Sequence, residues 1–134
     1  MARRIGMRAL ALIMVCFLAA CGDAQPTTSG DSGVEGVVHL GPQCPVEVAG
    51  QPCDDQPAGG VAVTVSLQVA GEMYGAGDPV AQTTTDALGR FRIAVPPGDY
   101  VVTAEAGMYC EFMDAHVVAD EYVEVDVPCD TGIR

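Results

Sequence analysis

The sequence predicts an all-β protein, a Greek-key β-sandwich of about seven strands. Short runs in which apolar and polar residues alternate recur after residue 33, with the period of two that half-buried strands show. Turn residues separate these runs at regular intervals, and residues 34–134 contain no convincing helical periodicity. The stretch has about the size of one sandwich, so it leaves no room for a second domain.

Residues 1–20 are predicted to be an export signal and not a part of the fold. Three arginines near the start precede the apolar residues 9–20, which are too few to span a bilayer. This run ends in Leu18-Ala19-Ala20-Cys21, which resembles the lipobox of bacterial lipoproteins. By this resemblance Cys21 becomes the first mature residue and carries acyl chains. The alternatives are an ordinary secretory signal with an incidental cysteine, or a cytosolic chain that begins with an apolar helix.

Residues 21–33 then form the lipidated N-terminus and a flexible tether, because residues 22–32 are polar and rich in Gly, Pro, Ser and Thr. Several acyl chains hold a protein stably on a membrane, whereas a single chain does not. We therefore expect residues 34–134 to form a domain outside the cytoplasm, anchored in the bacterial cell envelope to the outer or the plasma membrane.

The predicted mature chain is strongly acidic. Without residues 1–20 it keeps three arginines and all 18 acidic residues, a net charge of about −15. Such a chain should repel nucleic acid and anionic lipid headgroups, and it could attract cations or a basic partner. Solubility outside the cytoplasm is the simpler explanation of this charge.

The first predicted strand covers residues 34–40, with Val34, Val38 and Leu40 facing the core. A long loop rich in Pro and Gly follows at residues 41–60. The cleanest alternation is at residues 61–69, where every second residue is an inward valine or leucine. A connection that we expect to be mobile leads from there to a strand at residues 80–84.

Residues 85–104 are predicted to form a turn and then a hairpin. Asp86 and Gly89 suit a tight turn, because Asp bonds its own backbone and Gly accepts a positive φ. The prolines at 96 and 97 cannot donate to a ladder, so they interrupt the alternation. A hairpin turn centred between Pro97 and Gly98 places three apolar pairs on one face, namely Val95 with Tyr100, Ile93 with Val102 and Phe91 with Ala104.

A last hairpin is expected from residues 113–118 and 122–127. Centring its turn between Ala119 and Asp120 would bury the carboxylate of Asp114, which is unfavourable. Centring it on Asp120 leaves Asp114 and His116 in solvent, and we prefer this register. Its pairs are Val117 with Val123, Ala115 with Val125 and Met113 with Val127.

Four cysteines remain in the predicted domain, and an even number in an exported chain indicates two disulfides. Three connectivities are possible, of which we favour Cys44–Cys53 and Cys110–Cys129. A metal site is the rival interpretation, but no Cys-x-x-Cys pair occurs. The first disulfide would rigidify the long loop, which makes that loop the best candidate for a binding element. The residues of this candidate are Pro45, Val46, Glu47 and Val48.

The motifs Thr85-Asp86-x-x-Gly89-x-Phe91 and Pro96-Pro97-Gly98-x-Tyr100-x-Val102 resemble the carboxypeptidase regulatory-like domains. This family is grouped with the prealbumin- or transthyretin-like and Cna-B-like sandwiches, and the resemblance covers residues 33–134. It implies a spacer, an accessory domain or a binding module. Carboxypeptidase catalysis belongs to a separate zinc domain, and the Lys–Asn isopeptide bond of Cna-B-like domains is excluded because the chain has neither lysine nor asparagine.

We therefore expect no enzyme and no cofactor, and a membrane together with an envelope protein or a glycan as partners. Tyr74, Tyr109 and Tyr122 are the available aromatic platforms for a glycan. The alternative function is a metal-binding domain that uses Glu111, Asp114 and His116, with Glu124 and Asp126 on the same predicted face. Such oxygen-rich surroundings suit calcium better than zinc. A solvated acidic face is the simpler interpretation of this cluster.

Overall fold

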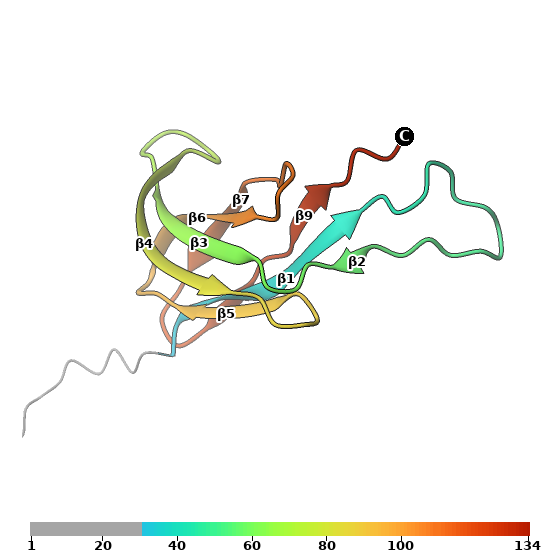
Figure 1. Cartoon of the computed structure of the whole chain (residues 1–134). Coiled ribbons are helices and arrows are strands. Elements are labelled where there is room, and N and C mark those ends of the chain that lie inside the picture. Colours follow the sequence, from blue (N-terminus) through green and yellow to red (C-terminus); the bar gives the residue numbers. More distant parts are fainter. Residues whose placement is uncertain (1–30) are drawn as a thin grey trace, which may run out of the picture.

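A computed structural model describes residues 31–134 as two packed β-sheets, which confirms the predicted all-β sandwich (Figure 1). The predicted signal at 1–20, Cys21 and most of the tether lie outside these residues. No helix within residues 31–134 is long and apolar enough to cross a membrane. The described strands are β1 (Gly33–Gly41), β2 (Gln56–Pro57), β3 (Ala62–Gln68), β4 (Ala76–Thr84), β5 (Arg90–Ala94), β6 (Gly98–Glu105), β7 (Met113–Val117), β8 (Tyr122–Glu124) and β9 (Val127–Asp130).

The five-stranded sheet is built around β1. The first half of β1 pairs with β5 in antiparallel and with β8 in parallel orientation, and its second half pairs with β2 and β9 in the same two ways. At Gly36, where β8 gives way to β9, the carbonyl of Val125 occupies the position of a Cβ. Only glycine fits at this close approach of two backbones.

The fold begins two residues earlier than the sequence predicts. The hydroxyl of Ser32 donates a hydrogen bond to the carbonyl of Val95 at 2.8 Å, and the Val95 N–H donates to the Ser32 carbonyl at 3.1 Å. Gly33 is already the first residue of β1. Ser32 and Gly33 therefore belong to the sandwich and not to the tether.

The second sheet has the antiparallel order β4-β3-β6-β7. Valines from both sheets meet between the layers and form most of the core. Burying one such side chain stabilises the fold by about 1.5–3 kcal/mol relative to leaving it exposed. The valines with at most 1% exposure in this core are Val34, Val38 and Val127 from the first sheet and Val63, Val65, Val102 and Val117 from the second.

The predicted hairpin of residues 91–104 is wrong. β5 pairs with β1 and β6 pairs with β3 and β7, so the chain crosses from one sheet to the other at Pro96 and Pro97. The Tyr100 hydroxyl donates to the Pro96 carbonyl at 2.6 Å and fixes this crossing. The alternation did not reveal the error, because strands on opposite sheets turn the same apolar residues toward one core.

The predicted last hairpin is wrong for the same reason. β7 lies in the four-stranded sheet and β8 in the five-stranded sheet. Ala115 is opposite Tyr100 and Val117 is opposite Gly98, instead of Val125 and Val123. Both alanine and valine are nevertheless buried in the core, as expected.

The outer end of β3 also departs from prediction. Leu67 and Val69 were expected to face the core but are 46% and 38% exposed. Two register irregularities around Ser66 disrupt the pairing of β3 with β4 there. Ser66 and Val101 are paired on the outer face of this sheet and are nevertheless buried.

The predicted tight turn before β5 is present. Gly89 has φ +73°, and Oδ1 of Asp86 accepts hydrogen bonds from the N–H groups of Leu88 and Arg90, both at 2.9 Å. The hydrogen bond from the Arg90 backbone is the main reason that the pKa of Asp86 lies below its ordinary value.

Candidate functional site

Residues 42–55, which we name the arm, leave the sandwich at the end of β1 and return at β2 (Figure 1). Cys44 and Cys53 form a disulfide across the arm, with their Cα atoms 6.0 Å apart. Beyond the disulfide, the Gln51 N–H donates to the Val48 carbonyl at 2.9 Å, and Gly50 has φ +83°. A tight turn therefore closes the tip of the arm.

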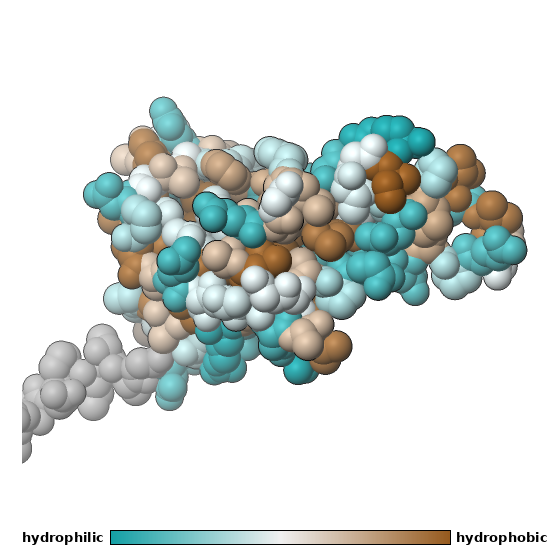
Figure 2. Space-filling view, viewed as in Figure 1, coloured by the Kyte–Doolittle hydropathy of each residue, from teal (hydrophilic) through white to brown (hydrophobic). Residues whose placement is uncertain are grey.

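The arm exposes its apolar side chains. Val46 is 71% and Val48 is 58% exposed, and Pro45 and Glu47 are also exposed. Figure 2 shows hydrophobic side chains on this projecting part of the molecule. The four residues that the sequence nominates for binding thus lie together on the arm, outside the core.

Contacts at the base hold the arm to the sandwich. Nδ1 of His39, on β1, lies 2.6 Å from Oδ2 of Asp55. The Gln43 side-chain amide donates to the Leu40 carbonyl at 2.8 Å. The Thr131 N–H donates to the Gly41 carbonyl at 3.0 Å. Both ends of the arm are therefore fixed where they join the sandwich.

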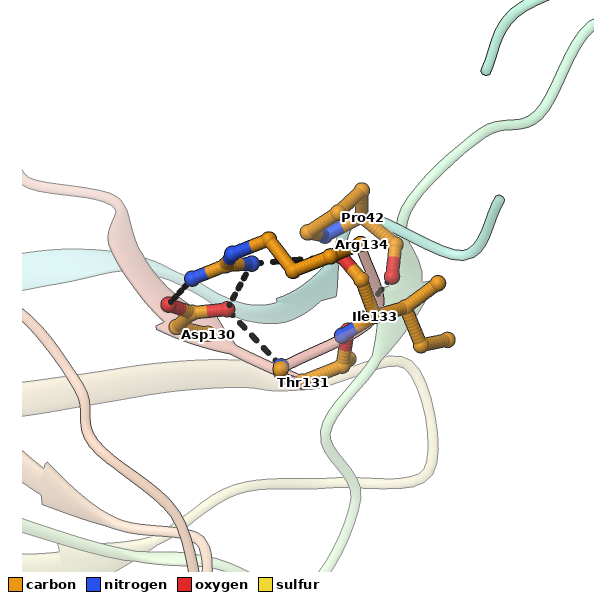
Figure 3. A network of polar contacts seen from close by, with 6 residues as sticks. Pro42, Asp130, Thr131, Ile133 and Arg134 are labelled. Atoms are coloured by element: carbon orange, nitrogen blue, oxygen red, sulfur yellow. Dashed lines mark hydrogen bonds and ion pairs between the residues drawn. The ribbon is translucent and has the colours of Figure 1, made fainter. Parts of the chain in front are cut away.

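The C-terminal tail packs beside this base (Figure 3). The Thr131 hydroxyl donates to the Pro42 carbonyl, and the Arg134 guanidinium bonds both oxygens of Asp130 at 2.8 and 3.2 Å. The hydrogen bond from Arg134, followed by one from the Gly132 N–H, lowers the pKa of Asp130 to about 2. The carboxylate of Asp130 therefore keeps its charge, and its bonds to the tail, to a lower pH than an ordinary aspartate would.

Two grooves lie on either side of the β6–β7 connection, and one of them is next to the tail. The first, the tail groove, has a volume of about 270 Å³, and its lining includes Pro42, Pro128 and Asp130. The second, the tyrosine groove, has a volume of about 390 Å³ and is lined by Tyr74, Tyr109, Glu111, Phe112 and Met113. Tyr109 and Glu111 line both grooves, so the two are neighbours on the surface.

The disulfide Cys110–Cys129 positions the residues that the two grooves share. It joins the β6–β7 connection to β9, and thus links the two sheets. On either side of it the Glu111 N–H donates to the Pro128 carbonyl at 2.9 Å and the Asp130 N–H donates to the Tyr109 carbonyl at 2.7 Å. The structure thus contains both disulfides that the sequence analysis favours.

The proposed metal ligands are not assembled into one site. Asp114 accepts hydrogen bonds from the Gln68 amide at 3.2 Å and the Tyr74 N–H at 2.9 Å, whereas His116 Nδ1 lies 2.6 Å from Asp99. Glu111 points into the grooves. Within residues 31–134 no group of three or more His, Cys, Asp or Glu side chains is placed to hold a metal ion.

The two further acidic residues lie away from this face. Glu124 lies on β8 in the five-stranded sheet, and Asp126 accepts a hydrogen bond from the Val37 N–H of β1 at 3.1 Å. They were expected beside Asp114 only because β7 and β8 were predicted to pair.

A third and larger depression, of about 600 Å³, lies beside β5, and its lining includes Glu35, Arg90, Arg92 and Glu124. Both arginines in it are already ion-paired, Arg90 with Asp86 at 2.9 Å and Arg92 with Glu35 at 3.1 Å. The Arg92 guanidinium also lies 3.6 Å above the ring of Tyr122. The positive charges that line this depression are therefore already paired within the domain.

A family model of the carboxypeptidase regulatory-like domain matches residues 48–129. The chain belongs to this family. No curated protein matches the chain. The carboxypeptidase regulatory-like match starts at the tip of the arm, so β1 and the first half of the arm lie outside the matched residues.

The sequence does not predict the grooves of this carboxypeptidase regulatory-like domain, although it offers two of their tyrosines as binding residues. Tyr74 and Tyr109 are two of the three tyrosines that the sequence offers as platforms for a glycan, but they lie in separate connections, β3–β4 and β6–β7, and Phe112 is not among the predicted site residues. One signal was available, because aromatic residues stand on both sides of a predicted disulfide cysteine. A buried disulfide fixes its neighbours, so exposed aromatic residues beside it are candidates for binding.

Proposed function

We propose that this carboxypeptidase regulatory-like domain is a binding module without catalytic activity, anchored to a membrane of the bacterial envelope through lipid on Cys21. Its arm binds an envelope protein or a glycan. The observation that carries the proposal is the exposure of Val46 and Val48 on a projecting, disulfide-closed segment. The family supports the absence of catalysis, because its members are generally non-catalytic domains.

Preorganisation supports a binding role for the arm. A free loop loses conformational entropy when it binds, and a loop that is already fixed avoids much of this cost. The Cys44–Cys53 disulfide and the contacts of His39 with Asp55 fix the arm at its base. Val46 and Val48 do not pack in the core, so they remain available to a partner.

The direction of the arm agrees with an anchor at the other end. β1 is nine residues long, so its two ends are roughly 26 Å apart. The described chain enters at the start of β1, and the arm leaves from its end (Figure 1). A lipid upstream of Asp31 would therefore be attached at the end of β1 opposite the arm, which leaves the arm free to reach a partner.

The anchor is tested by metabolic labelling of the full chain with a radioactive fatty acid. We expect label in the wild type and none in Cys21→Ser, which should also leave the membrane fraction. An unlabelled wild-type protein, or a Cys21→Ser variant that still sediments with membranes, would contradict the lipid anchor.

The arm is tested by capture of envelope components on the purified full chain. The double variant Val46→Ser/Val48→Ser should lose the partner that the wild type retains, and selective reduction of Cys44–Cys53 should weaken its retention. Leu88→Ser is the matched control, because Leu88 is 56% exposed on the turn before β5. Equal loss in the control, or unchanged retention by the arm variant, would rule out binding through the arm.

A further inference from the structure

We propose that the tyrosine groove binds an arginine side chain from an extended, basic segment of a partner protein. The site consists of the rings of Tyr74, Tyr109 and Phe112 together with the carboxylate of Glu111. It lies between the β3–β4 and β6–β7 connections, and the proposal depends neither on binding by the arm tip nor on the lipid anchor.

The three rings are exposed and come from two separate segments. Tyr74 in the β3–β4 connection is 50% exposed, and Tyr109 and Phe112 in the β6–β7 connection are 69% and 46% exposed. Aromatic ring faces attract cations, and the guanidinium of arginine also stacks on them. Rings that line one groove from two segments can therefore both contact a guanidinium group.

Glu111 supplies the matching charge. Its backbone is fixed by the N–H bond to Pro128 and by the adjacent disulfide at Cys110. Within residues 31–134, no side chain forms a hydrogen bond or ion pair with its carboxylate. A carboxylate accepts two parallel N–H bonds from a guanidinium, and this geometry favours arginine over lysine or a quaternary ammonium group.

The backbone of Tyr74 is held in an unfavourable conformation at the groove. Its φ is +60°, in the left-handed region that residues other than glycine seldom adopt. The hydrogen bond from its N–H to Asp114 at 2.9 Å holds it there. Local strain of this kind persists only where surrounding contacts enforce it, and it is frequent at ligand sites.

The chain itself contains the same combination with an arginine in place. Arg92 lies over the ring of Tyr122 at 3.6 Å and bonds Glu35 at 3.1 Å. The two other arginines of the described residues, Arg90 and Arg134, are ion-paired with Asp86 and Asp130, and the chain has no lysine. Residues 31–134 therefore leave no arginine or lysine side chain for the tyrosine groove, and the other arginines of the chain, Arg3, Arg4 and Arg8, belong to the predicted signal.

The shape and the charge favour an extended protein segment over a small cation. The tyrosine groove and the tail groove share Tyr109 and Glu111 in their linings, so an extended chain bound at these two residues can contact both grooves. The formal net charge of −12 attracts basic partners and raises their rate of association. A small cation would occupy only one of the two grooves.

The test uses the full chain, purified in detergent, and a fluorescein-labelled octapeptide of Gly and Ser with two arginines. Fluorescence anisotropy gives the affinity, and peptides with Lys or Gln in place of Arg give the selectivity. We expect Tyr109→Ala and Glu111→Gln each to weaken binding roughly tenfold. Tyr74→Gly should weaken binding as much without unfolding, because glycine accepts a positive φ.

Glu121→Gln and Leu88→Ala are the matched controls, since each changes one exposed charge or one exposed apolar group elsewhere. Both should bind within about twofold of the wild type. The arm variant Val46→Ser/Val48→Ser should also keep its affinity, which separates this proposal from the proposed function of the arm tip.

Equal weakening by Glu111→Gln and Glu121→Gln would show only general attraction to an acidic protein and would overturn the site. Arginine, lysine and glutamine peptides that bind alike would overturn the choice of arginine. If phosphocholine displaces the peptide and binds more tightly than the peptide does, the groove is a site for a small cation and not for a protein segment.

Discussion

The backbone N–H of Tyr74 donates a hydrogen bond to Oδ1 of Asp114 at 2.9 Å, across 40 positions of sequence. This contact holds the β3–β4 connection against the outer face of β7. Asp114 is one of the three residues named for the alternative metal-binding function, and in the structure it instead fixes the position of a tyrosine. The acidic character that favours calcium in the sequence thus has a structural use in the fold.

Asp114→Ala should lower the free energy of unfolding by about 1 kcal/mol, because it removes the acceptor of the Tyr74 N–H and of the Gln68 amide. Urea denaturation of the wild type and the variant measures this. Asp54→Ala removes an exposed carboxylate on the arm and should change the stability by less than about 0.5 kcal/mol. A rise in Tm with millimolar calcium that Asp114→Ala abolishes would contradict this account and favour the metal hypothesis.

Gly89→Ala should be strongly destabilising. An L-residue at φ +73° costs about 1–2 kcal/mol, and a Cβ there would also collide with the carbonyl of Val38 and the N–H of Ala58. We expect a total loss above about 2 kcal/mol by chemical denaturation.

Gly60→Ala is the matched control, because Gly60 has φ +70° but no atom within 4 Å of the added Cβ. It should cost about 1 kcal/mol, from the backbone conformation alone. Similar losses for the two variants would show that the close contact at Gly89 is not rigid.

Tyr100→Phe should cost about 1 kcal/mol at neutral pH, because it removes the hydrogen bond to the Pro96 carbonyl. Burial raises the pKa of the Tyr100 hydroxyl above its ordinary value of 10.0. The unfolded chain therefore ionises first, so the contribution is complete below pH 10 and is lost as the pH rises toward the folded pKa.

Denaturation between pH 8 and 11 should show a steeper loss of stability for the wild type than for Tyr100→Phe. Tyr109→Phe serves as the control, because its ring is 69% exposed. Parallel pH profiles for the wild type and Tyr100→Phe would exclude a buried Tyr100 at the crossing between the sheets.

The two disulfides should differ in accessibility and in effect. Cys110 and Cys129 are 4% and 2% exposed, whereas Cys44 and Cys53 are only half-buried. Exchange needs access to sulfur, so a reductant should open Cys44–Cys53 first. Timed alkylation and mass spectrometry measure this order.

Replacing Cys110 and Cys129 by serine should lower stability by about 2–4 kcal/mol, because their disulfide joins the two sheets through the core. The same change at Cys44 and Cys53 should loosen the arm and leave the sandwich folded. Global unfolding of the arm variant, or earlier alkylation of Cys110, would contradict this division.

The sequence predicts the strands and the core more reliably than it predicts their partners. Val34, Val63 and Val65 are buried as their alternation indicates. Alternation reports only whether a side chain faces the core, and both sheets of a sandwich face the same core. It therefore cannot decide whether the chain turns back or crosses over at Pro96 and Pro97, and this choice caused both wrong hairpins.

The candidate site was predictable only where it is local in sequence. Prolines, glycines and the short spacing of Cys44 and Cys53 are enough to nominate the arm. The tyrosine groove depends on two distant contacts, from Asp114 to Tyr74 and from Cys110 to Cys129. The sequence suggests Asp114 as a metal ligand and not as the partner of Tyr74, so the approach of Tyr74 to Tyr109 could not be expected.

The claim that the arm binds a partner in the envelope can be tested by photo-crosslinking in intact cells. A photoreactive amino acid is placed at Val48, 58% exposed on the arm, or at Leu88, 56% exposed on the turn before β5. We predict a discrete crosslinked product from position 48 and none from position 88. No product from position 48, or the same products from both positions, would contradict the claim.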